Sequence, residues 1–140
     1  QMCIRDRRFS FYTASLREAH PNTAVLEVRD AAGRTLTLQA ASTGGGRIRV
    51  DRLNGVDVSF TGMFNTLVVQ HQDIAGKVAD VTRALSSAKI NIANMSVCRD
   101  RRGGDALMVI ETDQKVPPVV RVLIGELRGI RSLTYYEKEE

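Results

Sequence analysis

NTLVVQHQDIAGKVADVTRALSSAKINIANMSV, residues 65–97, carries the clearest secondary-structure pattern in the chain. Residues Thr66 to His71 are rich in β-branched side chains and predict a short strand. A helix is predicted to begin near Gly76, because apolar residues then recur at helical spacing, at Val78, Val81, Leu85 and Ala88. Residues Asn91 to Val97 predict a second strand. The segment therefore predicts a strand, a tight loop, an amphipathic helix and another strand.

The residues that follow continue this alternation of strands and helices. A hairpin turn is predicted at Asp100 to Gly104, followed by a strand from Ala106 to Thr112. A second helix is predicted to begin near Pro117 and to stop before Gly129, with its apolar side formed by Val119, Val122, Leu123 and Leu127. Residues Ile130 to Tyr136 predict a closing strand. The order βαββαβ predicts an α+β, ferredoxin-like unit with both helices on one face of an antiparallel sheet.

A small antiparallel meander is predicted upstream, with strands at residues 23–29, 34–39, 47–53 and 56–60. Asn54-Gly55 favours a type I′ turn between the last two strands. A boundary near Thr61 to Met63 would divide the chain into a β-rich domain at 9–62 and a second domain at 63–140. Phe9 to Glu18 are expected to form the tail of a helix or an irregular lead-in. Residues 1–8 are expected to be a non-native or disordered leader.

Composition excludes several classes of protein. The chain has 140 residues, of which 43% are hydrophobic, and its formal net charge is +4. No apolar run is long enough to span a membrane, so a cytoplasmic location is the default. The basic residues are scattered and no aromatic residues interleave with them, so we expect solvated turns and no nucleic-acid partner.

The titratable residues show no catalytic or metal-binding spacing. Cys3 and Cys98 are far apart, and neither pairs with the ligands of a metal site. His20 and His71 lack the surroundings of a triad and are more typical of structural or surface residues. We therefore expect no catalytic residue and no metal site in this chain.

Two segments are candidate binding loops. The first contains Ser42, Thr43, Gly44, Gly45, Gly46 and Arg47, whose glycines, hydroxyls and cation suit a carboxylate or phosphate. A flexible connection between strands is the alternative.

The second loop contains Asp73, Ile74, Ala75 and Gly76 at a predicted helix N-terminus, where free N–H groups attract a carboxylate. Asp73 could neutralise an ammonium group, and Asn91 can both donate and accept hydrogen bonds. The alternative is that Asp73 is an N-cap and Asn91 merely starts a strand.

HQDIAGKVADVTRALSSAKINIANMSV, residues 71–97, resembles the ACT domain, whose usual pattern is D-x-P-G, a helix, then I-N-I. Ala75 stands where proline is usual. The resemblance implies a βαββαβ amino-acid sensor that pairs with a second copy through its sheet or its helices.

Further motifs resemble the β subunit of iron–sulfur L-serine dehydratase. They are HPNT at 20–23, ASTGGGRIRV at 41–50, NGVDVSFTG at 54–62 and RRGGDALMVIETD at 101–113. This resemblance implies an allosteric substrate-binding-like domain before the ACT domain, and a subunit that begins upstream of Phe9. It also implies an α subunit that holds the catalytic [4Fe-4S] cluster, which converts L-serine to pyruvate and ammonia.

The ACT domains of serine-sensing phosphoglycerate dehydrogenase are also similar, and their serine contacts match His71, Asp73 and Asn91. Asn is usual at the middle position, so Asp73 departs from the pattern. The hairpin at 42–47 resembles that family's second anion or substrate site only loosely. The expected effector is L-serine or a related amino acid, and a regulatory region of that dehydrogenase or a free-standing ACT module are the alternatives.

Overall fold

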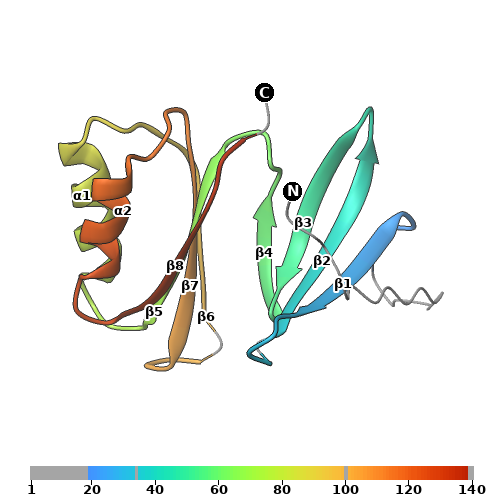
Figure 1. Cartoon of the computed structure of the whole chain (residues 1–140), viewed down its shortest axis with the longest axis horizontal. Helices are drawn as coiled ribbons and strands as arrows, with labels where there is room; N and C mark the ends of the chain where they lie inside the picture. The colour runs from blue at the N-terminus through green and yellow to red at the C-terminus, as the bar shows by residue number, and fades with distance from the viewer. Residues whose placement is uncertain (1–18, 34, 100, 139–140) are drawn as a thin grey trace.

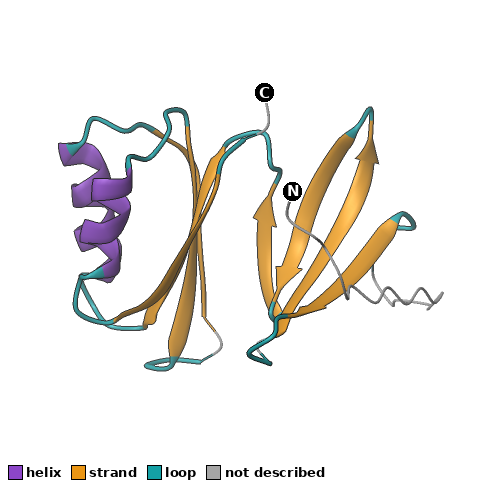
Figure 2. Ribbon diagram, viewed as in Figure 1, coloured by secondary structure: helices purple, strands orange, loops and turns teal. Residues whose placement is uncertain are grey.

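The computed structural model describes residues 19–33, 35–99 and 101–138, and these form three layers (Figure 1). Two helices cover one face of a four-stranded sheet, and a second four-stranded sheet lies against its other face (Figure 2). The expected leader at 1–8, the lead-in at 9–18, Arg34 and Asp100 lie outside the described residues.

The first sheet is an antiparallel meander with the strand order β1-β2-β3-β4. Its strands are β1 (Thr23–Arg29), β2 (Thr35–Gly44), β3 (Arg47–Leu53) and β4 (Val56–Phe60). The predicted bounds of β1, β3 and β4 are confirmed, whereas β2 continues beyond its predicted end at Gln39 because Ala40 and Ala41 also pair with β3. Asn54 and Gly55 both have positive φ, 50° and 80°, as the predicted type I′ turn requires.

The second sheet has the order β6-β7-β5-β8, and all its neighbouring strands are antiparallel. This order and the two helices confirm the predicted ferredoxin-like unit. Its elements are β5 (Asn65–Gln72), α1 (Lys77–Ser87), β6 (Ile92–Arg99), β7 (Asp105–Thr112), α2 (Pro118–Gly125) and β8 (Ile130–Tyr136). Neither helix is long and apolar enough to cross a membrane, as far as the described residues go.

The side chains of β5 point alternately to the two faces of its sheet. Leu67 and Val69 are fully buried against the helices, in a cluster completed by Val81, Leu85, Ile90, Met108, Ile110, Val116, Val120 and Ile124. Val68 points the other way and packs with Val109 against the first sheet, where Val50, Leu53, Val58 and Phe60 are buried. The two sheets therefore share a hydrophobic core.

The buried face of α1 differs in part from the prediction. Val81 and Leu85 are buried as expected, but Val78 and Ala88 are exposed, and Ala84 packs against the core instead. Lys77 is only 8% exposed, because its long aliphatic stem packs inward while its ammonium reaches Asp80.

The predicted face of α2 is wrong. Val120 and Ile124 are buried, and Val119, Val122 and Leu123 are 65%, 58% and 55% exposed. Apolar residues lie on every side of this short helix, so periodicity alone could not identify the face that contacts the sheet. Of the predicted side only Leu127, beyond the helix, packs against the core.

Candidate functional site

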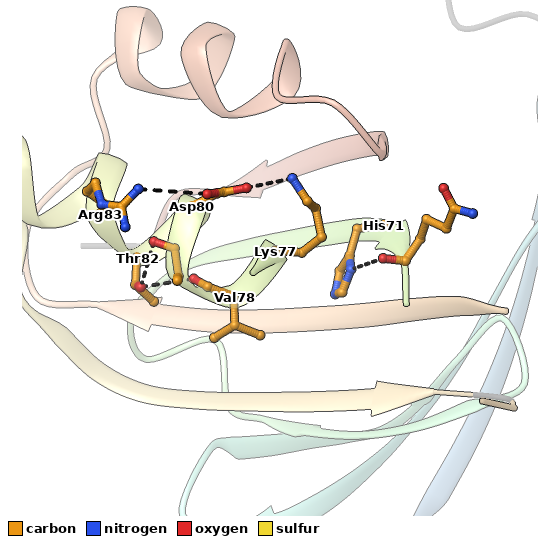
Figure 3. Close-up of polar contacts among 8 residues, drawn as sticks. His71, Lys77, Val78, Asp80, Thr82 and Arg83 are labelled. Carbon is orange, nitrogen blue, oxygen red and sulfur yellow. Dashed lines mark hydrogen bonds and ion pairs between the residues drawn. The ribbon is translucent and has the colours of Figure 1, made fainter. Parts of the chain in front are cut away.

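His71 lies near the end of β5 on the face that the helices cover, and it is 2% exposed (Figure 3). Its Nδ1 lies 2.9 Å from the carbonyl oxygen of Gln72. Since a carbonyl can only accept, Nδ1 carries the proton in the neutral ring and Nε2 offers a lone pair. Nε2 is buried and has no hydrogen-bond partner among the described residues. The ring can therefore accept one hydrogen bond from a donor that enters this loop.

Gly76 precedes α1 with φ 90°, in the left-handed region that glycine favours. Among the described residues, no acceptor is bonded to the backbone N–H of Ala75 or Gly76, which makes this helix start a suitable place for an anion. The ammonium of Lys77 is already engaged, since it donates to Asp80 Oδ2 over 2.5 Å. That bond lowers the pKa of the Asp80 carboxyl below its usual value.

Asp73 is not the N-cap of α1, because no side chain caps this helix. Instead, its Oδ2 accepts hydrogen bonds from Gly103 N and Arg99 Nη1, both at 3.0 Å. These two donors, Gly103 first, lower the pKa of the Asp73 carboxyl. Asp73 N also donates to Gly104 O over 2.8 Å, so the loop is fastened to the β6–β7 hairpin.

Asn91 does not join these residues within one chain. β6 begins opposite the same β7 residue as β5, since Ile92 and Asn65 both pair with Thr112. Asp73 follows the other end of β5, roughly 25 Å away along the strands. Asn91 instead donates from Nδ2 to Asp113 Oδ2 over 2.5 Å. The expected zwitterion pocket of Asp73 and Asn91 is therefore not formed by a single copy.

A groove of about 680 Å³ runs beside Asn91, between α1 and the start of β6. We call it the α1–β6 groove; it is lined by Ala79, Thr82, Arg83, Ser86, Lys89, Ile90, Asn91 and Ile92. Arg83 lies 3.8 Å from Asp80 and is largely exposed (Figure 3). Asn91 is thus accessible from the side of the sheet on which α1 lies.

The glycine-rich segment forms a tight hairpin. Gly44 pairs with Arg47 across the β2–β3 turn, and Gly45 and Gly46 have φ 61° and 76°. Thr43 Oγ1 donates to Arg47 O over 3.3 Å. The segment therefore forms a tight hairpin turn whose two central glycines both have positive φ.

The described residues contain no group of three side chains that could hold a metal ion. Cys98 is a free, half-buried thiol on the face of β6 toward the first sheet.

Sequence reasoning missed Arg99 and Gly103, the two partners of Asp73. One signal was available for Arg99. In a strand–helix–strand unit the two strands run parallel, so the residue that ends β6 lies at the same end of the strands as the loop after β5.

Comparison with known proteins gives two kinds of relative. Residues 65–124 match the ACT domain family. The chain is 36% identical over 115 residues to the probable L-serine dehydratase beta chain of Bacillus subtilis, covering 82% of this chain and 52% of that protein. It is 21% identical to the L-serine dehydratase beta chain of Peptoniphilus asaccharolyticus, with coverage of 82% and 50%.

D-3-phosphoglycerate dehydrogenases are the second kind of relative, and that of Synechocystis sp. is 27% identical over 139 residues, which cover 89% of this chain and 25% of that protein. The D-3-phosphoglycerate dehydrogenase of Bacillus subtilis is 36% identical over 90 residues, which cover 56% of this chain and 17% of that protein. The chain spans about half the length of the L-serine dehydratase beta chains that it matches.

Proposed function

Residues 65–124 are an ACT domain in a homologue of L-serine dehydratase beta chains, and from this premise we propose that the chain is the regulatory and assembly module of an L-serine ammonia-lyase. The reaction of the whole enzyme would convert L-serine to pyruvate and ammonia. The observation that carries this proposal is the combination of identity and length in the match to the Bacillus subtilis beta chain. An alignment of 115 residues at 36% identity extends well beyond the ACT segment into the first sheet.

The reacting groups of such an enzyme would lie in a separate α subunit. A [4Fe-4S] cluster of the holoenzyme would supply Lewis-acid chemistry, and the residues described here do not fit it. They include one cysteine, Cys98, and no group of three metal-ligating side chains. We propose that the α subunit holds the cluster and that the enzyme is cytoplasmic.

The ACT domain would bind L-serine or a related amino acid at a site shared by two copies. β6 is an edge strand of its sheet, so its outer hydrogen-bonding groups can pair with another strand. Antiparallel pairing of two β6 strands about a two-fold axis would bring Asn91 of one copy to the Asp73 end of the other. The separation of Asn91 from Asp73 within one chain therefore favours homodimerisation.

Each loop residue would have a distinct role in that site. The N–H groups of Ala75 and Gly76, with Ile74 beside them, would hold the effector's carboxylate at the start of α1. Asp73 Oδ1, which accepts no hydrogen bond from the described residues, would face the ammonium. His71 Nε2 would accept from the ammonium or a hydroxyl, and Asn91 of the second copy would close the site.

Two experiments test the two parts of this proposal. Co-expression with a candidate α subunit under anaerobic conditions should give a complex that forms pyruvate from L-serine, and an inactive, stable complex would refute the lyase assignment. Isothermal titration of the chain with L-serine tests sensing. Absence of binding by an active α–β complex would refute the sensing role alone.

The regulatory region of a D-3-phosphoglycerate dehydrogenase is the second candidate, favoured by the 36% identity to the Bacillus subtilis enzyme. Serine inhibition of a dehydrogenase that carries this module would support it. The hairpin at 42–47 remains a separate candidate for a small anion, with Arg47 as its cation.

A further inference from the structure

A second groove, of about 470 Å³, lies between α2 and β8, on the side of the sheet that faces away from the first sheet (Figure 1). We call it the α2–β8 groove; its lining residues are Pro118, Arg121, Val122, Gly125, Leu133 and Tyr135. The four helix residues recur at helical spacing and therefore form one side of α2. β8 is an edge strand, so a partner can approach the groove from this edge of the sheet.

Arg121 is the charged group of the groove, and it lies over the ring of Tyr135 with 4.7 Å between its Cζ and the ring centroid. The ring is fixed in place, because its hydroxyl donates to Asn65 Oδ1 over 3.2 Å and accepts from Val116 N over 3.1 Å. The Arg121 guanidinium is therefore held in position at the groove.

The Arg121 guanidinium has no acceptor within the part of the chain that the structure describes. Its Nε is buried without a hydrogen-bond partner, and no described carboxylate forms an ion pair with it. A buried donor without an acceptor is unfavourable. A guanidinium can hold a carboxylate with two parallel hydrogen bonds, so this group suits a carboxylate from another molecule.

Apolar side chains surround this cation. Leu133 and the Tyr135 ring form one wall of the groove, while Val119, Val122 and Leu123 on α2 are each more than half exposed. The apolar surface is thus wider than the groove, as expected for contact with a protein rather than with a small molecule. Arginine and tyrosine are also enriched at the centres of protein interfaces.

A second copy of this chain does not supply the missing carboxylate at this surface. In a two-fold pairing both copies present the same patch. None of the residues that line the groove is acidic, so such a pairing would bring two Arg121 cations together. The charge of the groove therefore favours a different partner chain.

We propose that the α2–β8 groove binds the α subunit, through an apolar segment of that subunit that carries one carboxylate. The carboxylate would pair with Arg121, and the apolar side chains would pack against Val122 and Leu133. Gly125 leaves room for them, because a Cβ at this position would meet no atom within 4 Å. The identity of this partner rests on the proposed function, which supplies an α subunit.

Association of the full 140-residue chain with a candidate α subunit, co-expressed under anaerobic conditions, tests the proposal. Arg121→Glu places a like charge against the carboxylate, and Gly125→Leu fills the groove. Each should weaken the association roughly tenfold or more. Arg29→Glu on β1, where the arginine side chain is 69% exposed, is the control and should associate like the unmodified chain. Urea unfolding of the free variants checks their folding, and Gly125→Leu decides the outcome if Arg121→Glu does not fold.

Hydrogen–deuterium exchange adds a measurement that needs no variant. The amides of residues 118–125 should exchange more slowly in the α–β complex than in the free chain. Unchanged exchange at these residues would overturn the proposal and leave the lyase assignment intact, as would a complex that both variants form normally. Protection that rises with the concentration of the free chain would also overturn it, because a second copy would then occupy the groove. Absence of any complex with the unmodified chain would refute the assembly role itself, and this docking surface with it.

Discussion

Arg99 Nη1 lies 3.0 Å from Asp73 Oδ2, although 26 residues separate them in the chain. The contact joins the last residue of β6 to the loop after β5. Gly103 N and Gly104 O add two further hydrogen bonds between the same loop and the β6–β7 hairpin. The loop that would receive an effector's ammonium is therefore positioned by the neighbouring hairpin and not by the helix that it precedes.

The Asp73 carboxyl should titrate below its ordinary value. Its pKa is lowered first by the hydrogen bond from Gly103 and then by that from Arg99. A carboxyl whose folded-state pKa is depressed adds stability that is fully present above the unfolded pKa, about 3.9, and is lost as the pH falls through the folded value. The fastening of the loop should therefore persist at pH 5 and weaken only in more acidic solution.

Carbon-detected NMR of the Asp73 side chain measures this titration. Arg99→Gln should raise the pKa of Asp73, but the Gly103 bond should still hold it below the ordinary value. Arg83→Gln, whose guanidinium lies beside Asp80, is the matched control and should leave Asp73 unchanged. A normal Asp73 pKa in the unmodified protein would contradict the contact.

Removing Glu111 should destabilise the connection between the two sheets. Glu111 is 4% exposed, and its Oε1 accepts from Thr61 N over 3.1 Å, while its Oε2 accepts from Asn94 Nδ2 over 3.0 Å. Glu111→Met leaves the N–H of Thr61 without its acceptor and should cost about 1–3 kcal/mol in urea unfolding.

Glu111→Gln provides the contrast, because its amide oxygen can still accept from Thr61 while the exposed Asn94 amide turns to accept from its NH2 group. We expect less than about 1 kcal/mol for this change. Equal losses for the two variants would show that the acceptor at Thr61 contributes nothing.

Replacing a side chain by alanine should affect the free energy of unfolding differently on the two sides of α2. Ile124 is fully buried, so Ile124→Ala should lower the free energy of unfolding by about 2–5 kcal/mol. Leu123 is 55% exposed, and Leu123→Ala should change it by less than about 0.5 kcal/mol. Thermal or urea unfolding measures both. A larger loss at Leu123 than at Ile124 would mean that the opposite face of α2 is covered in solution.

These residues also show where sequence reasoning succeeds. The strands and hairpins are predictable, because alternation and turn residues such as Asn54-Gly55 are local signals. The buried face of α2 is not, because Val119, Val120 and Leu123 are equally apolar and the sheet alone selects among them. For such a helix, packing against the sheet determines which side is buried.

The candidate site, too, could be predicted from the sequence only in part. The start of α1 at Lys77 follows from local pattern, but the partners of Asp73 lie 26 and 30 residues away. Asn91 was expected beside Asp73 because it starts the next strand. The helix between them instead returns the chain to the end of the sheet where β5 began, so the start of β6 lies far from the end of β5.

Mixing two defective variants should restore effector binding if the site is shared between copies. Asp73→Ala and Asn91→Ala should each weaken L-serine binding roughly 10- to 100-fold, as expected for loss of a hydrogen bond to a charged group. In a two-fold dimer, a mixed pair carries one site with both residues intact and one site with neither.

Random exchange at equal concentrations makes about half of the dimers mixed, so about a quarter of the sites should regain normal affinity. Calorimetry with L-serine after subunit exchange measures this fraction. The double variant Asp73→Ala/Asn91→Ala mixed with unmodified chain is the control. Each site of a mixed dimer then lacks one residue, so exchange should lower the fraction of normal sites from about a half to about a quarter. If both residues acted within one copy, the mixture of single variants would bind no better than its components, since every site would keep one defect.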